Sequence, residues 1–271
     1  MNLRNRKVLV VGAHPDDAEM FCAGTLFHLR DLGCEIHIAT MTLGDCGSTE
    51  HSSEEIRRIR RGEAEAACAF LGASYRYLGF NDLSIFNDDA SNRRTTALLR
   101  DIDPLMVMTH PPHDYMSDHE TTSLLVRNAC FGAPAPNYDT LSFTPVTRSS
   151  AIPYLYYFES MDGIDIFGRR LVPHFYVDIT GTIEARLKML GHHQSQRKWL
   201  QSHHGLDDYV EAARQRCRDA GERASQTFGR RLVYAEGFCQ HLGHAYPHEN
   251  ILAQVLEHRV VSGNGGAHRS S

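Results

Sequence analysis

Two short stretches of this sequence collect the residue types that bind metals and transfer protons. Residues 14–17 read His-Pro-Asp-Asp, and residues 114–119 read Asp-Tyr-Met-Ser-Asp-His. Two imidazoles and one carboxylate leave coordination positions open, as in catalytic metal sites, whereas a structural zinc site is closed by four protein ligands. We therefore expect His14, Asp17 and His119 to bind a catalytic metal. Zinc is the leading candidate, although non-haem iron uses the same ligand set.

Asp16 is the carboxylate that remains free beside these ligands. A bound metal lowers the pKa of water towards 7 and stabilises a developing oxyanion, while an adjacent carboxylate accepts the proton of the attacking water. A carboxylate at this position can therefore serve as a general base, but the spacing alone predicts only a metal site. Structural roles are the alternatives. Asp16 and Glu19 have the spacing of a helix N-cap, and His14 could simply pack in its turn. Asp118 could do no more than favour the positive end of a helix.

The elements around the two polar stretches predict where they lie. Lys7 to Val11 is an apolar, β-branched run typical of a buried parallel strand, and apolar residues recur at helical spacing from Ala18 onward. Residues 105–109 read as another such strand. Ser117 and Glu120 have capping-box spacing, which predicts a helix from residue 118. Each polar stretch therefore lies in a turn between a strand and a helix, where open α/β sheets bind ligands.

The remaining pattern predicts an α/β fold in one domain. We expect a Rossmann-like, mostly parallel sheet flanked by helices, with a helical and β C-terminal elaboration, over residues 1–261, and a flexible tail at 262–271. A polar loop at 43–53 could reach over the site. The further strands are expected at 35–42, 75–78, 152–158 and 174–179, and a short buried segment at 232–238. The further helices are expected at 54–71, around 95–99, and at 182–200, 206–228 and 250–258.

Composition excludes several classes of function. The 271 residues carry a formal net charge of −5, so the composition does not indicate a basic surface for binding nucleic acid. No apolar stretch reaches the roughly 18 residues that a membrane span needs. The seven cysteines are scattered without a C-x-x-C pair, and no apolar leader precedes the first strand. We therefore expect a cytoplasmic protein.

The stretch G-A-H-P-D-D-A-E at 12–19 resembles the signature of the PIG-L/LmbE-like de-N-acetylases, which are zinc enzymes that remove acetyl groups from N-acetylglucosaminyl compounds. The likeness extends along the chain. D-Y-M-S-D-H at 114–119 is similar to the second metal turn of that family. R-R-G-E-A-E-A-A at 60–67, F-Y-V-D-I-T at 175–180, H-Q-S-Q at 193–196 and Y-A-E-G-F at 234–238 resemble further family segments.

This resemblance implies a role for each matching position. His14, Asp17 and His119 become the zinc ligands, and Asp16 becomes the general base. Three further residues are implied near the substrate: Arg60 holding sugar hydroxyls or an acidic aglycone, Asp118 orienting neighbouring groups, and His193 approaching from the C-terminal part.

One position departs from the family pattern. Many members have H-P-D-H in the second turn, whereas this chain has M-S-D-H and so places Met116 where the first histidine stands. A thioether neither protonates an amine nor stabilises an oxyanion well. We rank His193 first as the substitute, ahead of His110 and His113.

Together these features predict a zinc-dependent hydrolase that removes the N-acetyl group of a small amino-sugar compound. The alternatives are an amidase of the same architecture that cleaves a larger acyl or cysteinyl conjugate, an iron enzyme built on the same ligand set, and a binding domain without catalysis. The aglycone and any homo-oligomeric state are left open.

Overall fold

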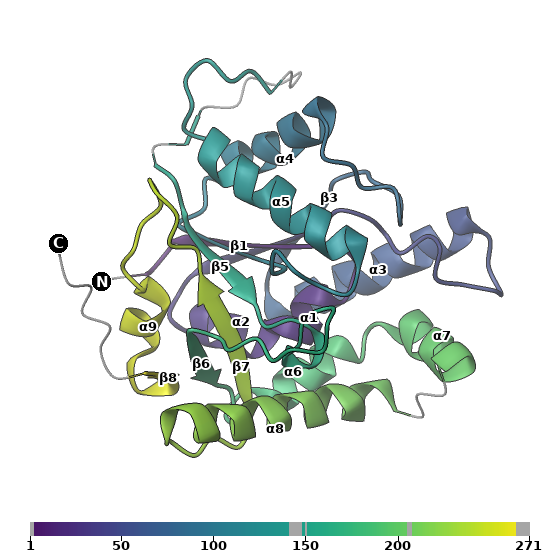
Figure 1. Ribbon diagram of the computed structural model, residues 1–271. Helices are drawn as coiled ribbons and strands as arrows, with labels where there is room; N and C mark the ends of the chain where they lie inside the picture. The colour runs from purple at the N-terminus through teal and green to yellow at the C-terminus, as the bar shows by residue number, and fades with distance from the viewer. Residues whose placement is uncertain (1–2, 141–147, 150, 205–207, 264–271) are drawn as a thin grey trace.

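The computed structural model describes residues 3–140, 148–149, 151–204 and 208–263. Within them, one eight-stranded sheet has the order β3-β2-β1-β4-β5-β7-β6-β8 (Figure 1). Strands β1 to β5 run parallel to one another, and β7, β6 and β8 continue the sheet with antiparallel pairing. The strands span Lys7–Gly12 (β1), Glu35–Thr40 (β2), Ser74–Tyr77 (β3), Met106–Thr109 (β4), Tyr154–Phe158 (β5), Phe175–Asp178 (β6), Ala235–Gln240 (β7) and Val260–Ser262 (β8).

Helices cover both faces of this sheet. In β1, Val8 and Val10 join the core formed with α2, α3, α6, α8 and α9, while Leu9 and Val11 join the core formed with α4 and α5. This explains why the strand is a continuous apolar run: both of its faces are buried. The helices span Asp17–Phe21 (α1), Ala23–Asp31 (α2), Ser53–Leu71 (α3), Asp89–Ile102 (α4), Ser117–Gly132 (α5), Ile183–Leu190 (α6), Gln194–His204 (α7), Tyr209–Phe228 (α8) and Ile251–Leu256 (α9), with 3-10 turns at Met161–Gly163 and Glu257–Arg259.

The sheet order brings the two polar stretches together. Strand β1 pairs with β2 on one side and with β4 on the other, and Val11 is in register with Thr109. The chain leaving β1 and the chain leaving β4 therefore emerge side by side, at the point where the strand order reverses. Ligands bind at this switch point in open α/β sheets. The predicted α/β fold with a mostly parallel sheet is confirmed.

Several boundaries differ from those predicted. The helix expected from Ala18 is divided at Cys22 into α1 and α2. The carboxylate of Glu236, on distant β7, accepts hydrogen bonds from the backbone N–H groups of Gly24 and Thr25, at 2.9 and 2.8 Å. A carboxylate is stabilised at the start of a helix, so tertiary packing favours a second helix start here.

The capping box predicted at Ser117 and Glu120 is wrong. Ser117 is the first residue of α5, and Met116 occupies the N-cap position without a side-chain hydrogen bond. The Glu120 side chain instead accepts a hydrogen bond from the backbone of Asp114 at 3.0 Å. It braces the polar turn that precedes α5.

The C-terminal part also departs from the expected elements. The helix predicted over 182–200 is divided into α6 and α7, and the short strand β8 was not expected. Strand β8 ends at Ser262, inside the range predicted as a tail, and residues 264–271 of that range lie outside the described residues. The domain limits of 1–261 stay a prediction. No helix in the described residues is long and apolar enough to cross a membrane.

We predict that Glu236→Gln lowers the free energy of unfolding by about 3 kcal/mol, because it leaves the buried charge of Arg186 uncompensated. The Glu236 carboxylate lies 3.2 Å from the Arg186 guanidinium, and both side chains are almost fully buried. Urea denaturation followed by circular dichroism measures the change. The control is Glu184→Gln in the exposed pair with Arg214, which should leave the midpoint nearly unchanged. Equal midpoints for the two variants would contradict the structural role of Glu236.

Candidate functional site

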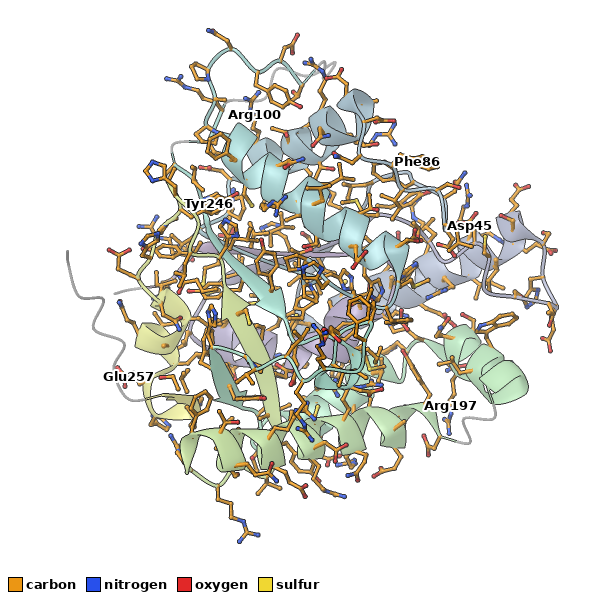
Figure 2. The ribbon with its side chains drawn as sticks, in the orientation of Figure 1. Asp45, Phe86, Arg100, Arg197, Tyr246 and Glu257 are labelled. Carbon is orange, nitrogen blue, oxygen red and sulfur yellow. The ribbon has the colours of Figure 1, made fainter. Side chains whose placement is uncertain are left out.

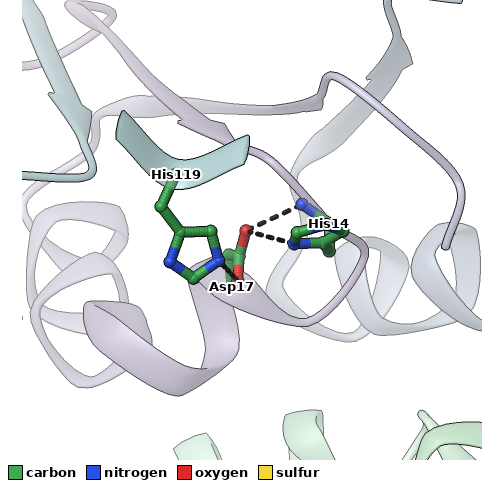
Figure 3. Close-up of side chains that lie close together, drawn as sticks. All are labelled: His14, Asp17 and His119. Carbon is green, nitrogen blue, oxygen red and sulfur yellow. Dashed lines mark hydrogen bonds and ion pairs between the residues drawn. The ribbon is translucent and has the colours of Figure 1, made fainter. Parts of the chain in front are cut away.

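The three predicted metal ligands lie together at the switch point (Figure 3). His14 follows β1, Asp17 begins α1, and His119 lies in the first turn of α5. One ligand atom from each lies within 4.8 Å of the others. The carboxylate of Asp17 lies between the imidazoles, with Oδ2 3.8 Å from His14 Nδ1 and Oδ1 3.7 Å from His119 Nε2. The structure thus brings these residues together from two turns about a hundred positions apart.

A buried carboxylate holds each imidazole in place. Asp118 Oδ2 lies 3.3 Å from His14 Nε2, and Asp114 Oδ1 lies 3.0 Å from His119 Nδ1. In each ring the other nitrogen faces Asp17. Metal-ligating histidines typically donate the distant N–H to a carboxylate, which leaves the lone pair of the near nitrogen for the metal. The residues present therefore fit a divalent metal at this position.

Asp17 is ionised despite its burial. Burial opposes the charge, but the imidazoles of His110, His119 and His14 hold the pKa of Asp17 well below its usual range. The Oδ2 atom also accepts a 2.7 Å hydrogen bond from the His14 backbone and lies 2.9 Å from His110 Nε2. An anionic carboxylate among lone-pair donors is a suitable ligand for a cation.

Asp16 points away from the helix that it precedes. Its φ angle of +128° is rare for a non-glycine residue, and its side chain makes no capping hydrogen bond. Instead, Oδ1 accepts a hydrogen bond from Arg60 Nη2 at 3.3 Å, and Oδ2 accepts a hydrogen bond from the Tyr209 hydroxyl. Strained backbone of this kind clusters at functional sites. The structure therefore does not support the alternative of a simple N-cap.

The pKa of Asp16 is shifted in the opposite direction to that of Asp17. Burial raises the pKa of Asp16, while the charges of Arg60 and His193 partly offset this rise. Two adjacent carboxyl groups thus have pKa values that environment pushes apart, a pattern that separates a proton-transferring group from a permanently charged one.

The polar loop at 43–53 lies against the site, in the position expected. Arg60 Nη1 donates to the carbonyl oxygen of Gly44 at 3.4 Å, and the Asp82 carboxylate accepts from the backbone of Gly44 and Cys46 at 3.1 and 3.0 Å. Asp45, labelled in Figure 2, bonds Arg57 of α3 at 2.8 Å. These bonds fix the loop at the mouth of the site.

A cleft of about 400 Å³ opens above these residues. Its polar floor contains His14, Asp16, Asp17, His119 and Arg60. Its walls are mostly apolar and come from α1, the turn before α5, the 3-10 turn at 161–163, α7 and α8. The residues of this wall include Met20, Tyr115, Met116, Met161, Trp199, Leu200, Tyr209 and Arg216.

The proposed substitutes for the missing histidine lie elsewhere. His193 is 1% exposed, and its Nε2 lies 3.2 Å from Glu19 behind the site. His110 is fully buried and stacks on His119 with ring centroids 3.8 Å apart. Neither residue is among the cleft-lining residues, and nor is His113, whereas Met116 is. The sequence prediction that placed His193 near the substrate gains no support from this position.

Sequence reasoning missed Asp114 and Tyr209. Asp114 stands five residues before His119 in the same polar turn, so the general need for a carboxylate behind a metal-binding histidine could have identified it. Tyr209 is 193 positions from Asp16, on α8, and no local pattern connects the two.

We predict that Gly44→Ala lowers the free energy of unfolding by about 2 kcal/mol, because positive φ disfavours a side chain and the new methyl group would overlap the Arg60 guanidinium. The φ angle of Gly44 is +70°. Thermal or urea unfolding measures the loss. Gly62→Ala, in α3 with open space around it, is the control, and we expect it to gain about 0.5–1 kcal/mol. A gain at both positions would show that Gly44 is not constrained by Arg60.

Comparison with known proteins bears on this geometry. The model of the family described as PIG-L, GlcNAc-PI de-N-acetylase, matches residues 9–130, which include both polar turns. The chain is 30% identical over 153 residues to a probable N-acetyl-alpha-D-glucosaminyl L-malate deacetylase 2 from Bacillus cereus, covering 53% of this chain and 70% of that protein.

Two further similarities extend over most of the chain. A 4-oxalmesaconate hydratase from Pseudomonas putida is 26% identical over 245 residues, covering 88% of this chain and 90% of that protein. The structure of the N,N'-diacetylchitobiose deacetylase from Pyrococcus horikoshii superimposes with a TM-score of 0.71 at 25% identity, covering 91% of this chain and 88% of the other. The fold is therefore shared by proteins whose names indicate different reactions.

Proposed function

The chain belongs to the PIG-L family, and on that premise we propose that it is a zinc-dependent hydrolase that removes the acetyl group of an N-acetylglucosaminyl compound. The observation that carries this proposal is the His14, Asp17 and His119 cluster beside the separately held carboxylate of Asp16. The scattered cysteines, all unpaired, support a reducing, cytoplasmic location.

His14, Asp17 and His119 would hold the metal. When bound, it polarises the acetamide carbonyl and lowers the pKa of water. The two nitrogens and one carboxylate favour zinc, and non-haem iron remains the alternative for the same donors. Metal analysis of protein purified without added metal distinguishes the two.

Asp16 performs the proton transfers of the reaction. It accepts a proton as a water oxygen bonds to the acetyl carbon, and it returns that proton to the nitrogen as the C–N bond breaks, so acetate and a free amine leave. A single carboxyl can serve both steps because burial raises its pKa towards the working range. Arg60 and Tyr209 hold its two oxygens, and neither His110 nor His193 lines the cleft to donate instead.

We predict that Asp16→Asn reduces turnover by about a hundredfold or more, because an amide cannot accept the proton of water. Amine release from N-acetylglucosaminyl compounds measures turnover, and elemental analysis measures bound metal. Metal content should stay at the wild-type level, since Asp16 is not one of the proposed ligands. Near-normal turnover with metal bound would remove the base assignment.

We predict that Asp114→Asn weakens metal binding about 10- to 100-fold, because the carboxylate no longer fixes the ring of His119. A competition titration with a chromophoric chelator gives the affinity. Asp101→Asn, which changes an exposed aspartate near Arg76, is the matched control and should bind as the wild type does. Unchanged affinity in Asp114→Asn would contradict the orienting role.

A second candidate function is the addition of water across a carbon–carbon double bond. It is favoured by the similarity to the 4-oxalmesaconate hydratase, which spans about nine-tenths of both chains. The same base would deprotonate water, but no amide bond would break. Three substrates separate the candidates. Free amine and acetate from an N-acetylglucosaminyl compound indicate the deacetylase, and a larger acid released from a bulkier acyl or cysteinyl conjugate indicates the amidase. Hydration of 4-oxalmesaconate indicates the hydratase.

A further inference from the structure

A second arginine lines the cleft, and its hydrogen-bonding capacity is largely unused. Arg60 is only 4% exposed and donates to Asp16 and to the Gly44 carbonyl. Arg216, on α8, instead has its Nε 3.4 Å from the exposed carboxylate of Asp162 and its Nη1 2.8 Å from the sulfur of Met20. A thioether is a weak acceptor. No hydrogen bond to Nη2 forms within the described part of the chain.

Arg216 lies close to the reaction centre. Met20, which its Nη1 contacts, is four residues after Asp16 and three after Asp17 on α1. Arg216, Met20 and the carboxylates of Asp16 and Asp17 line the same cleft.

The wall around Arg216 is apolar. Three methionines, Met20, Met116 and Met161, face the cleft together with Trp199 and Leu200. Methionine packs well against apolar and aromatic groups of varied shape, but it offers almost nothing to a sugar hydroxyl. The guanidinium of Arg216 within this apolar wall is complementary to a ligand that has both an anionic group and an apolar group.

We propose that Arg216 binds a carboxylate of the substrate, carried on an apolar or aromatic aglycone attached to the N-acetylglucosaminyl group. This inference rests on the proposed function, which places the acetamide over Asp16. A guanidinium can donate two parallel hydrogen bonds to a carboxylate, which gives both affinity and orientation. Asp162 anchors Nε and leaves Nη1 and Nη2 for this contact.

The test compares a charged and a neutral form of one probe. Binding of the 4-carboxyphenyl and 4-carbamoylphenyl glycosides of N-acetylglucosamine to the zinc-loaded protein is measured by isothermal titration calorimetry. We expect the carboxylate to bind about tenfold more tightly than the carboxamide, as for a hydrogen-bonded ion pair. Arg216→Gln should reduce the preference to about twofold or less, and Arg216→Lys should restore part of it.

Arg218→Gln is the matched control, because Arg218 is on the same helix, bonds Tyr234 and does not line the cleft. It should keep the full preference. A carboxylate preference that persists in Arg216→Gln would come from the metal or Arg60 and would overturn the proposal, as would the absence of any preference in the wild type.

Amine release, measured separately, keeps the two proposals distinguishable. If N,N'-diacetylchitobiose and the carboxyphenyl glycoside are not deacetylated but the preference still depends on Arg216, the deacetylase proposal fails and the carboxylate site stands. If diacetylchitobiose is hydrolysed equally by the wild type and Arg216→Gln without a carboxylate preference in binding, the carboxylate site alone fails.

Discussion

The buried carboxylate of Asp17 is the group on which the site depends. A charge out of water is costly unless partners compensate it, and here the partners are a backbone N–H and imidazoles from both turns. Those partners converge only because β1 and β4 are adjacent and in register. The hydrophobic pattern that pairs β1 with β4 therefore also brings the imidazoles to the Asp17 carboxylate, and so keeps it charged. Asp118 and Asp114 extend this arrangement, because their carboxylates lie beside the imidazoles of His14 and His119.

The proposed base, Asp16, is held by a different part of the molecule. Asp16 is adjacent to Asp17 in the chain, but its side chain points towards Arg60 of α3 and Tyr209 of α8. The positive φ of Asp16 strains the backbone, and in this conformation the carboxylates of Asp16 and Asp17 face different partners. One carboxylate is thereby kept charged among imidazoles, and the other has its pKa raised by burial. A single turn thus contains both the proposed metal ligand and the proposed proton acceptor.

The departure at Met116 becomes understandable in the context of the cleft. Met116 faces the cleft alongside Met20 and Met161, so the thioether continues an apolar wall. The family relationship supports the chemistry proposed for the polar floor, and we propose that the apolar wall contributes to the choice of substrate. The similarity to both deacetylases and a hydratase is consistent with this separation, since one floor can activate water against different bonds.

The sequence by itself determined the α/β fold, the two strand-ending turns and the grouping of His14, Asp17 and His119. These features follow from strand patterning and from residues a few positions apart, which local geometry constrains. Only the tertiary structure showed that Tyr209 reaches Asp16, that Arg216 enters the cleft, and that His193 lies behind it. It also showed that Glu236 divides the first helix. Those outcomes depend on how α7, α8 and β7 pack against the sheet. The same helical periodicity is compatible with several such packings, so no pattern in the chain could choose among them.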